Sequence, residues 1–248
     1  MKIICFSDVH LLLHDSEEEK SKLKILNSFF DFIEKEKPDK LIIAGDLFDV
    51  WYEYKLVIPK PYFHILCRLS SIEKLGIKII YLVGNHDFKF KNFFDKYIHA
   101  QIFYDDYQLN LNNEKYFFSH GDEYTSNDMR YHILKSILRN KLVNKVFGLF
   151  HPDIGLKFGR WMSRSSKNKQ DPPDKLKKLE KGMIDFAKMK IHQGYNYIIM
   201  GHIHNPKIIE LKKGKYINLG DWIVHHSYLI IDKKGPQLKY WRDKITDK

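Results

Sequence analysis

Short apolar runs alternate with amphipathic stretches over the first third of the chain. Three runs are continuous and β-branched, as in strands buried on both faces, and they cover residues 2–7, 40–44 and 77–83. Between them, residues 17–37 and 59–75 place apolar side chains at helical spacing, and Pro38 and Gly76 end these stretches. This β-α-β-α-β order predicts parallel strands joined by right-handed crossovers.

The pattern changes after residue 100. Segments around residues 101–109 and 115–119 are aromatic-rich or alternate apolar and polar side chains, and an asparagine-rich turn separates them. They predict strands of a second, more antiparallel sheet. Residues 197–200 form another buried run, and the segments KYINLG and HHSYLIID are expected to close this second sheet.

Residues 124–190 differ in character from the rest. Apolar residues are dense from 131 to 150, but their faces do not align, which favours two short helices with a break near Asn140. Glycines, a serine-rich run and two prolines predict an irregular, mobile stretch from 155 to 173, before a further helix at 175–193. We therefore expect a basic, apolar-rich helical insertion at 124–190 and a core made of residues 1–123 and 191–248.

Composition narrows the class of protein. The chain has 248 residues, of which 44% are hydrophobic, enough for one sizeable core. Cys5 and Cys67 have no spacing that suggests a disulfide framework or a thiolate zinc site, so a reducing compartment is expected. Asp8 and His10 interrupt the first apolar run, and no run reaches the roughly 18 apolar residues of a membrane span. We expect a soluble protein that is peripheral to a membrane at most.

The net charge of +11 is concentrated in the insertion. Residues 124–190 contain 16 lysines and arginines against 6 acidic residues, a net charge of +10. Such a segment suits an anionic partner, namely a phosphate-bearing substrate, nucleic acid or an anionic lipid surface. A lysine-rich, solvated face without a partner is the alternative.

Polar side chains able to bind metals or move protons follow five of the predicted strands. In chain order they are Asp8 and His10, Asp46 and Asp49, Asn85 and His86, His120, and His202 and His204. Any one cluster would fit an ordinary turn, but five at strand ends, where α/β sheets place ligands, indicate one site. Carboxylates, imidazoles and an amide without cysteine suit Mn²⁺, Fe or Zn²⁺. An aspartate can bridge two ions about 3.5–4 Å apart that activate a shared water, so the sequence predicts a two-metal hydrolytic site.

The order D-x-H, G-D-x-x-D, G-N-H-D, H-G-D and G-H-x-H resembles the calcineurin-like metallophosphoesterase superfamily. The resemblance implies a four-layer αββα sandwich with a helical lid insertion. It implies one metal held by Asp8, His10, Asp46 and His204, and a second held by the bridging Asp46 with Asn85, His120 and His202. It also implies that His86 meets the scissile phosphate and protonates the leaving group, and that Asp49 orients His86.

A narrower resemblance lies outside the metal ligands. The segments GDLFDVW, GNHDF, HGDEYTSND and LFHPDIGLKFGRWMSRSSK are similar to UDP-2,3-diacylglucosamine diphosphatases of lipid A synthesis, in the variants of Bacteroidetes-type bacteria. The resemblance implies cleavage of the substrate's pyrophosphate to UMP and 2,3-diacylglucosamine 1-phosphate, two Mn²⁺ ions, and a peripheral position on the cytoplasmic face of the inner membrane. The insertion would be a lid over the acyl chains. Implied substrate contacts are Asn85, His86, Asp128, Arg164, Ser166 and Lys167.

Other functions remain open at this point. His86 stands where the best-studied branch of that family has arginine, so a proton donor replaces a phosphate clamp, which also suits a phosphoesterase of another nucleotide, nucleic acid or phosphoprotein substrate. Leu, Ile and Val dominate residues 131–146, without the interleaved aromatics of nucleic-acid sites, so no nucleic acid is expected. No obligate protein partner is inferred. A metal-free binding protein of the same fold is the third alternative, and retention of every ligand argues against it.

Overall fold

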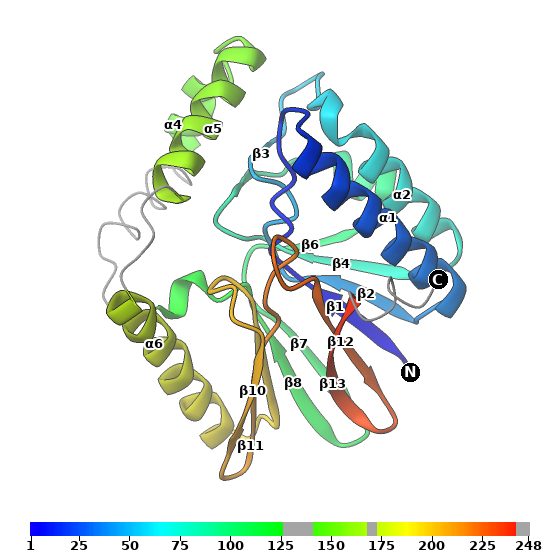
Figure 1. Ribbon diagram of the computed structural model, residues 1–248, viewed down its shortest axis with the longest axis vertical. Helices are drawn as coiled ribbons and strands as arrows, with labels where there is room; N and C mark the ends of the chain where they lie inside the picture. The colour runs from blue at the N-terminus through cyan, green and yellow to red at the C-terminus, as the bar shows by residue number, and fades with distance from the viewer. Residues whose placement is uncertain (126–140, 168–172, 242–248) are drawn as a thin grey trace.

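Two β-sheets lie face to face with helices on their outer faces (Figure 1). The computed structural model describes residues 1–125, 141–167 and 173–241. Within these residues the first sheet has six strands in the order β13-β12-β1-β2-β4-β6, and the second has five in the order β10-β11-β9-β8-β7. This α-β-β-α arrangement confirms the predicted fold class.

The first sheet is parallel except at one edge. Its strands are β1 (Ile3–Phe6), β2 (Lys40–Ile43), β4 (Lys78–Leu82), β6 (Gln101–Phe103), β12 (Ser227–Asp232) and β13 (Gly235–Tyr240). Strands β1, β2, β4 and β6 pair in parallel, whereas β12 runs antiparallel to both β1 and β13. Helices α1 (Glu17–Glu36) and α2 (Phe63–Lys74) make the predicted crossovers between parallel strands.

The second sheet is mixed. Its strands are β7 (Tyr107–Leu111), β8 (Glu114–Phe118), β9 (Tyr197–Met200), β10 (Lys207–Leu211) and β11 (Gly214–Asn218). Strand β9 is parallel to β8 and β11, and an antiparallel hairpin partner flanks each of these two. Helix α6 (Pro173–His192) contacts β9 and β11 and covers the outer face, although it lies within the predicted insertion.

Shorter elements surround the end of the sandwich at which the parallel strands finish. They are β3 (Trp51–Tyr52), paired with β5 (Asp87–Lys89), the 3₁₀ turns η1 (Lys60–Tyr62) and η3 (Asp122–Tyr124), and the π-helical turn η2 (Phe94–Ile98). Helices α4 (Lys141–Phe147) and α5 (Pro152–Lys167) form a pair at the top of Figure 1, away from α6. The helix break predicted near Asn140 lies outside the described residues.

Three apolar clusters fill the spaces between the four layers. On β1, Ile4 and Phe6 point to the cluster under α1 and α2, whereas Ile3 and Cys5 point to the cluster between the sheets. The third cluster joins the second sheet to α6, for example through Met183. Because successive strand residues face opposite sides, a continuously apolar run is what a strand between two cores requires.

Three sequence predictions about the fold are wrong. The segment 101–109 is not one strand of the second sheet, because Asp105 and Asp106 lie in a break between β6 and β7, which join different sheets. The strand in HHSYLIID pairs with β1 in the first sheet. The stretch predicted as irregular from residue 155 is helical as far as Lys167. The two strand errors arise because periodicity indicates a strand but not its partner. The helix error arises because glycines can lie inside a helix where it packs closely against its neighbours.

Candidate active site

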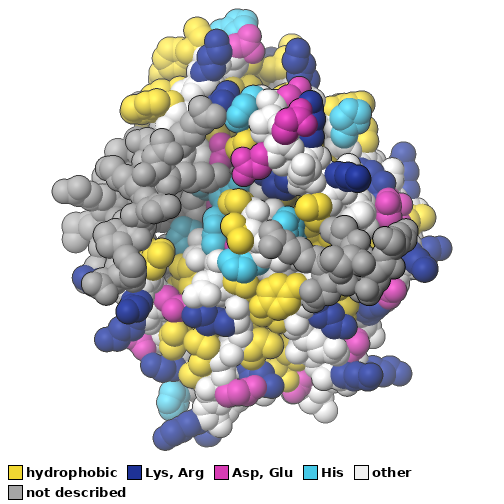
Figure 2. Space-filling view, in the orientation of Figure 1, with side chains coloured by type: hydrophobic (Ala, Val, Ile, Leu, Met, Phe, Trp, Pro, Cys, Tyr) yellow, Lys and Arg dark blue, Asp and Glu magenta, His cyan; other side chains and the backbone are white. Residues whose placement is uncertain are grey.

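The five predicted polar clusters lie at the carboxyl ends of β1, β2 and β4 in the first sheet and of β8 and β9 in the second. Hydrogen bonds and ion pairs join clusters from different strands and from both sheets. In Figure 2 histidine side chains gather in the middle of the face that carries these strand ends. The structure therefore brings together residues that are up to 196 positions apart in the sequence.

One group of side chains surrounds His204. Its Nε2 lies 3.2 Å from Oδ1 of Asp8 and 3.2 Å from Nε2 of His10. Nε2 of His10 lies 3.7 Å from Oδ1 of Asp8 and 3.8 Å from Oδ2 of Asp46. The polar atoms of Asp8, His10 and His204 lie close enough together to hold one metal ion, and two imidazoles with a carboxylate suit a hard or borderline divalent cation.

A second group surrounds Asn85. Its Oδ1 lies 3.0 Å from Nε2 of His120 and 2.9 Å from Nδ1 of His202, and Nε2 of His120 is 3.4 Å from Oδ2 of Asp46. Nδ1 of His120 donates to the carbonyl of Ala44 at 2.9 Å, so in the neutral ring Nε2 presents a lone pair. The lone pair on Nε2 of His120 would repel Oδ1 of Asn85 unless a proton or a cation lies between the two atoms.

Asp46 lies between the two groups. Its Oδ2 is within 4.0 Å of Nε2 atoms on His10, His86 and His120. A carboxylate in this place is suited to bridge two cations. Carboxylate, imidazole and amide groups of this kind are chemically suited to hold divalent cations.

The charges of the buried carboxylates are balanced by histidines. Among the described residues, the ion pairs of Asp8 and Asp46 are all with histidine. Burial alone would raise the pKa of Asp46, but His120 and His86 outweigh it and lower this pKa. Burial opposes charge on His120, yet Asp46 outweighs it and raises the pKa of His120. The site is thus built to hold positive charge beside two carboxylates.

The backbone is strained at most of these residues. Asp8, His10, Asp46, His202 and His204 all have left-handed φ angles, between 49° and 69°. This region costs L-residues on the order of 1 kcal/mol each and is concentrated at functional sites. Gly84 permits a close approach, because a Cβ there would overlap Oδ1 of Asp46. The placement of these side chains therefore lowers the free energy of unfolding.

His86 is held by the main chain of Asp49. Its Nδ1 lies 2.7 Å from the carbonyl oxygen of Asp49, to which it donates, whereas the Asp49 carboxylate is 4.0 Å away. This leaves Nε2 of His86 directed toward Asp46, at 4.0 Å from Oδ2. An imidazole with one nitrogen anchored and the other facing the site can hold or release a proton there.

Asp87, for which the sequence suggests no catalytic role, is a hydrogen-bond acceptor behind the site. Its carboxylate accepts the backbone N–H of Gly84 at 2.9 Å, that of Asp46 at 3.1 Å and the hydroxyl of Tyr81 at 2.9 Å. Burial, together with the nearby charge of Asp46, raises the pKa of Asp87 to about 7. Asp87 therefore ties the loop after β2 to the loop after β4.

Two features of the site were not predicted from the sequence. The loop after β11 borders the first group, since the N–H of Trp222 donates to the carbonyl of Asp8 at 3.0 Å. In that loop the buried carboxylate of Asp221 lies 2.5 Å from Nδ1 of His225. The sequence signal that could have indicated this loop is the pair Gly220–Asp221 just after a strand. The second feature is Ser163, whose hydroxyl donates to Asp49 at 2.6 Å.

The structure does not describe the side chains of four residues that were predicted to contact the substrate. Asp128 lies outside the described residues. Arg164, Ser166 and Lys167 belong to the last turns of α5, beside Ser163, and their side chains are likewise outside the described part of the chain.

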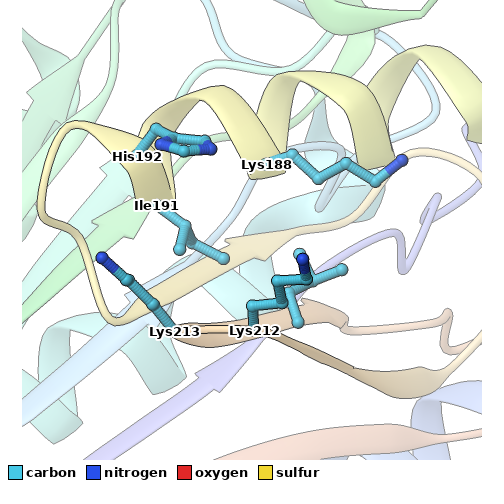
Figure 3. Close-up of a pocket in the computed structure, with 6 residues that line it drawn as sticks. Lys188, Ile191, His192, Lys212 and Lys213 are labelled. Atoms are coloured by element: carbon cyan, nitrogen blue, oxygen red, sulfur yellow. The ribbon is translucent and has the colours of Figure 1, made fainter.

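A cavity of about 290 Å³ lies elsewhere, between the end of α6 and the β10–β11 hairpin (Figure 3). Ile191 and Leu211 provide its apolar surface, and its other lining residues are Lys188, His192, Lys212 and Lys213. It contains none of the residues at the five strand ends, so it is separate from the candidate active site.

Comparisons with known proteins agree with this geometry. A sequence model of the calcineurin-like phosphoesterases matches residues 1–206. A UDP-2,3-diacylglucosamine hydrolase of Porphyromonas gingivalis is 27% identical, with 93% of this chain and 94% of that protein covered. One of Haemophilus ducreyi is 26% identical, with 92% and 95% covered.

A solved structure supports the fold. Yfce, a phosphoesterase from E. coli, aligns with a TM-score of 0.50 at 15% identity, covering 98% of this chain and 94% of that one. The family match spans all the predicted metal ligands, and five of them, Asp8, His10, Asp46, His120 and His204, fall in groups that could hold a metal ion. The chain therefore belongs to the calcineurin-like phosphoesterase family and is a metal-dependent hydrolase.

Proposed function

We propose that this hydrolase cleaves the pyrophosphate of UDP-2,3-diacylglucosamine, giving UMP and 2,3-diacylglucosamine 1-phosphate (lipid X) for lipid A biosynthesis. The observation that carries the proposal is the apolar surface of the α4–α5 pair, where Leu149, Phe150, Ile154, Phe158 and Trp161 are exposed. Helix α5 reaches the site itself through the contact of Ser163 with Asp49. Exposed apolar side chains next to a phosphate-hydrolysing centre suit a substrate with acyl chains. The two bacterial relatives, which are named as UDP-2,3-diacylglucosamine hydrolases, support this choice.

Two divalent ions are part of the proposal, with Mn²⁺ expected and Fe or Zn²⁺ as alternatives. Asp8, His10, Asp46 and His204 would hold one ion, and Asp46, Asn85, His120 and His202 the other. When bound, the ions would lower the pKa of a water and neutralise charge on the phosphate oxygens.

The protein's own groups would orient the substrate and move the proton. His86, held through Nδ1 by the Asp49 carbonyl, presents Nε2 to the scissile phosphate. In its doubly protonated form it donates this Nε2–H to the leaving oxygen, as a general acid. We propose that Asn85 and His86 contact the phosphates, and that Asp128, Arg164, Ser166 and Lys167 contact the sugar and phosphates from the insertion side.

The test is release of UMP from UDP-2,3-diacylglucosamine by protein loaded with Mn²⁺. We expect Asp46→Ala and His120→Ala to lower the rate at least about 100-fold, because each removes a ligand from the buried cluster. Asp185→Ala, on the exposed face of α6, is the matched control and should retain the wild-type rate. Cleavage of a simple aryl phosphodiester with this lipid left untouched would contradict the substrate assignment.

We further propose that the protein acts peripherally on the cytoplasmic face of the inner membrane. Among the described residues, no helix combines the length and apolar character needed to cross a bilayer. An apolar surface within the segment 124–190, whose net charge is +10, suits an anionic interface. Reversing the charge of the lysines and arginines between Lys135 and Lys145 should weaken binding to anionic liposomes. Unchanged binding would show that this charge serves another purpose.

A further inference from the structure

Helix α5 contacts the core along a line of small residues. Gly155, Gly159 and Ser163 are spaced by four and so share one face of the helix. A Cβ at Gly159 would lie 2.7 Å from Cγ1 of Val50, and one at Gly155 would overlap the hydroxyl of Tyr54. The backbone of α5 therefore lies directly against the chain on either side of β3.

The third residue of this line makes a polar contact with the active site. The hydroxyl of Ser163 donates to Oδ1 of Asp49 at 2.6 Å, and the two residues are only 3% and 2% exposed. A short bond from a hydroxyl to a carboxylate in a buried place is among the stronger hydrogen bonds. Its loss would remove a buried, charge-assisted hydrogen bond, which makes the contact costly to break.

Asp49 contacts its neighbours through both its carboxylate and its main chain. Its carboxylate accepts from Ser163 on α5, and its main-chain carbonyl accepts from Nδ1 of His86. The backbone N–H of Asp49 donates to the carbonyl of Leu11, on the loop after β1. Because the side chain and the carbonyl belong to one residue, a shift of residue 49 after loss of the Ser163 contact would also move the carbonyl that accepts from His86.

We propose that Ser163 is a positioning residue that fixes the orientation of His86 through Asp49, so that hydrolysis depends on α5 being seated on the core. The inference rests on the proposed role of His86 in hydrolysis and does not depend on which phosphoester is the substrate. The same helix exposes Phe158 and Trp161 on its surface, so contacts made there reach His86 through one rigid element.

The test uses diphenyl phosphate, which has no acyl chain and whose phenoxide leaving group is basic enough to need a proton, and Mn²⁺-loaded full-length protein. We expect Ser163→Ala to lower kcat about tenfold, with KM and bound metal unchanged, because only the proton donor is misplaced. Ser163→Thr keeps a hydroxyl and should restore kcat. Lys157→Ala, at an exposed position of the same helix, is the matched control and should match the wild type. Wild-type kcat in Ser163→Ala would overturn the inference.

A double-mutant cycle with His86→Ala separates this inference from the proposed function. If Ser163 acts through His86, Ser163→Ala should cause no further loss in the His86→Ala protein. Independent, multiplying losses would refute the coupling while leaving His86 in its role. Wild-type kcat in His86→Ala alone would instead refute the role of His86.

Gly159→Ala provides a second route if Ser163→Ala loses metal or unfolds. Alanine is a better helix former than glycine, but here its Cβ would meet Val50 at 2.7 Å and displace α5. We expect kcat to fall about tenfold as in Ser163→Ala, despite the better helix former. A rate equal to the wild type would overturn the dependence on α5.

Discussion

At the scale of single residues, the site combines strained backbones with a dense set of hydrogen bonds behind them. Asp46 adopts a left-handed φ of 53°, and its N–H is one of three donors that converge on the buried Asp87 carboxylate. Gly84 and Tyr81 supply the other two donors. In the G-N-H-D turn, Asn85 and His86 therefore face the site, whereas Asp87 holds their loop after β4 to the loop after β2 that carries Asp46.

Substitution of Asp87 should reveal this support role. Asp87→Ala leaves two backbone N–H groups and one hydroxyl without their buried acceptor, so we expect a loss of about 3 kcal/mol in the free energy of unfolding. Asp87→Asn keeps an acceptor oxygen of the same shape and should lose less than about 1 kcal/mol. Urea unfolding of the metal-free proteins measures both values. Equal losses would mean that charge on Asp87, rather than its acceptor geometry, stabilises the loops.

At the scale of elements, each cluster is the local continuation of a strand, which is why the sequence predicts it. An apolar run, a turn and a metal-binding side chain lie within about ten residues in each case, and parallel pairing then brings the ends together. Sheet membership was less predictable, since the partner of β12 is β1, at the opposite end of the chain. The contact of Ser163 with Asp49 spans 114 positions and depends on packing of α5 that periodicity does not encode.

The α4–α5 pair should recognise acyl chains. Because burying a large apolar side chain contributes about 1.5–3 kcal/mol, we expect Leu149→Ser or Trp161→Ser to raise KM for UDP-2,3-diacylglucosamine roughly tenfold. Hydrolysis of an aryl phosphodiester should not change. Leu75→Ser, at an exposed position at the end of α2, is the control. If both substrates were affected equally, these side chains would support the fold rather than bind acyl chains.

At the scale of the whole molecule, the site joins the two sheets. Asp8, Asp46 and Asn85 follow strands of the first sheet, whereas His120 and His202 follow strands of the second. The apolar cluster between the sheets includes Ile3 and Cys5, close in sequence to the first ligands. A cation held by residues from both sheets would therefore link the two halves of the sandwich.

Metal removal should consequently lower stability. A ligand that binds only the folded state at 100 times its Kd adds about 2.7 kcal/mol, so Mn²⁺ should raise Tm relative to EDTA-treated protein by several degrees. Asp46→Ala, which removes the proposed shared ligand, should show a much smaller rise. Thermal unfolding with and without Mn²⁺ measures this, and an identical Tm in both conditions would argue against a metal site that joins the sheets.

The most direct test of the proposed function compares UDP-2,3-diacylglucosamine with UDP-glucosamine, which has the same pyrophosphate and no acyl chains. With Mn²⁺-loaded protein, kcat/KM should be at least about 100-fold higher for the diacyl substrate, because buried methylenes contribute about 0.8 kcal/mol each. UMP and 2,3-diacylglucosamine 1-phosphate should form in equal amounts. Equal kcat/KM values for the two substrates, or no cleavage of the diacyl substrate, would contradict the proposal.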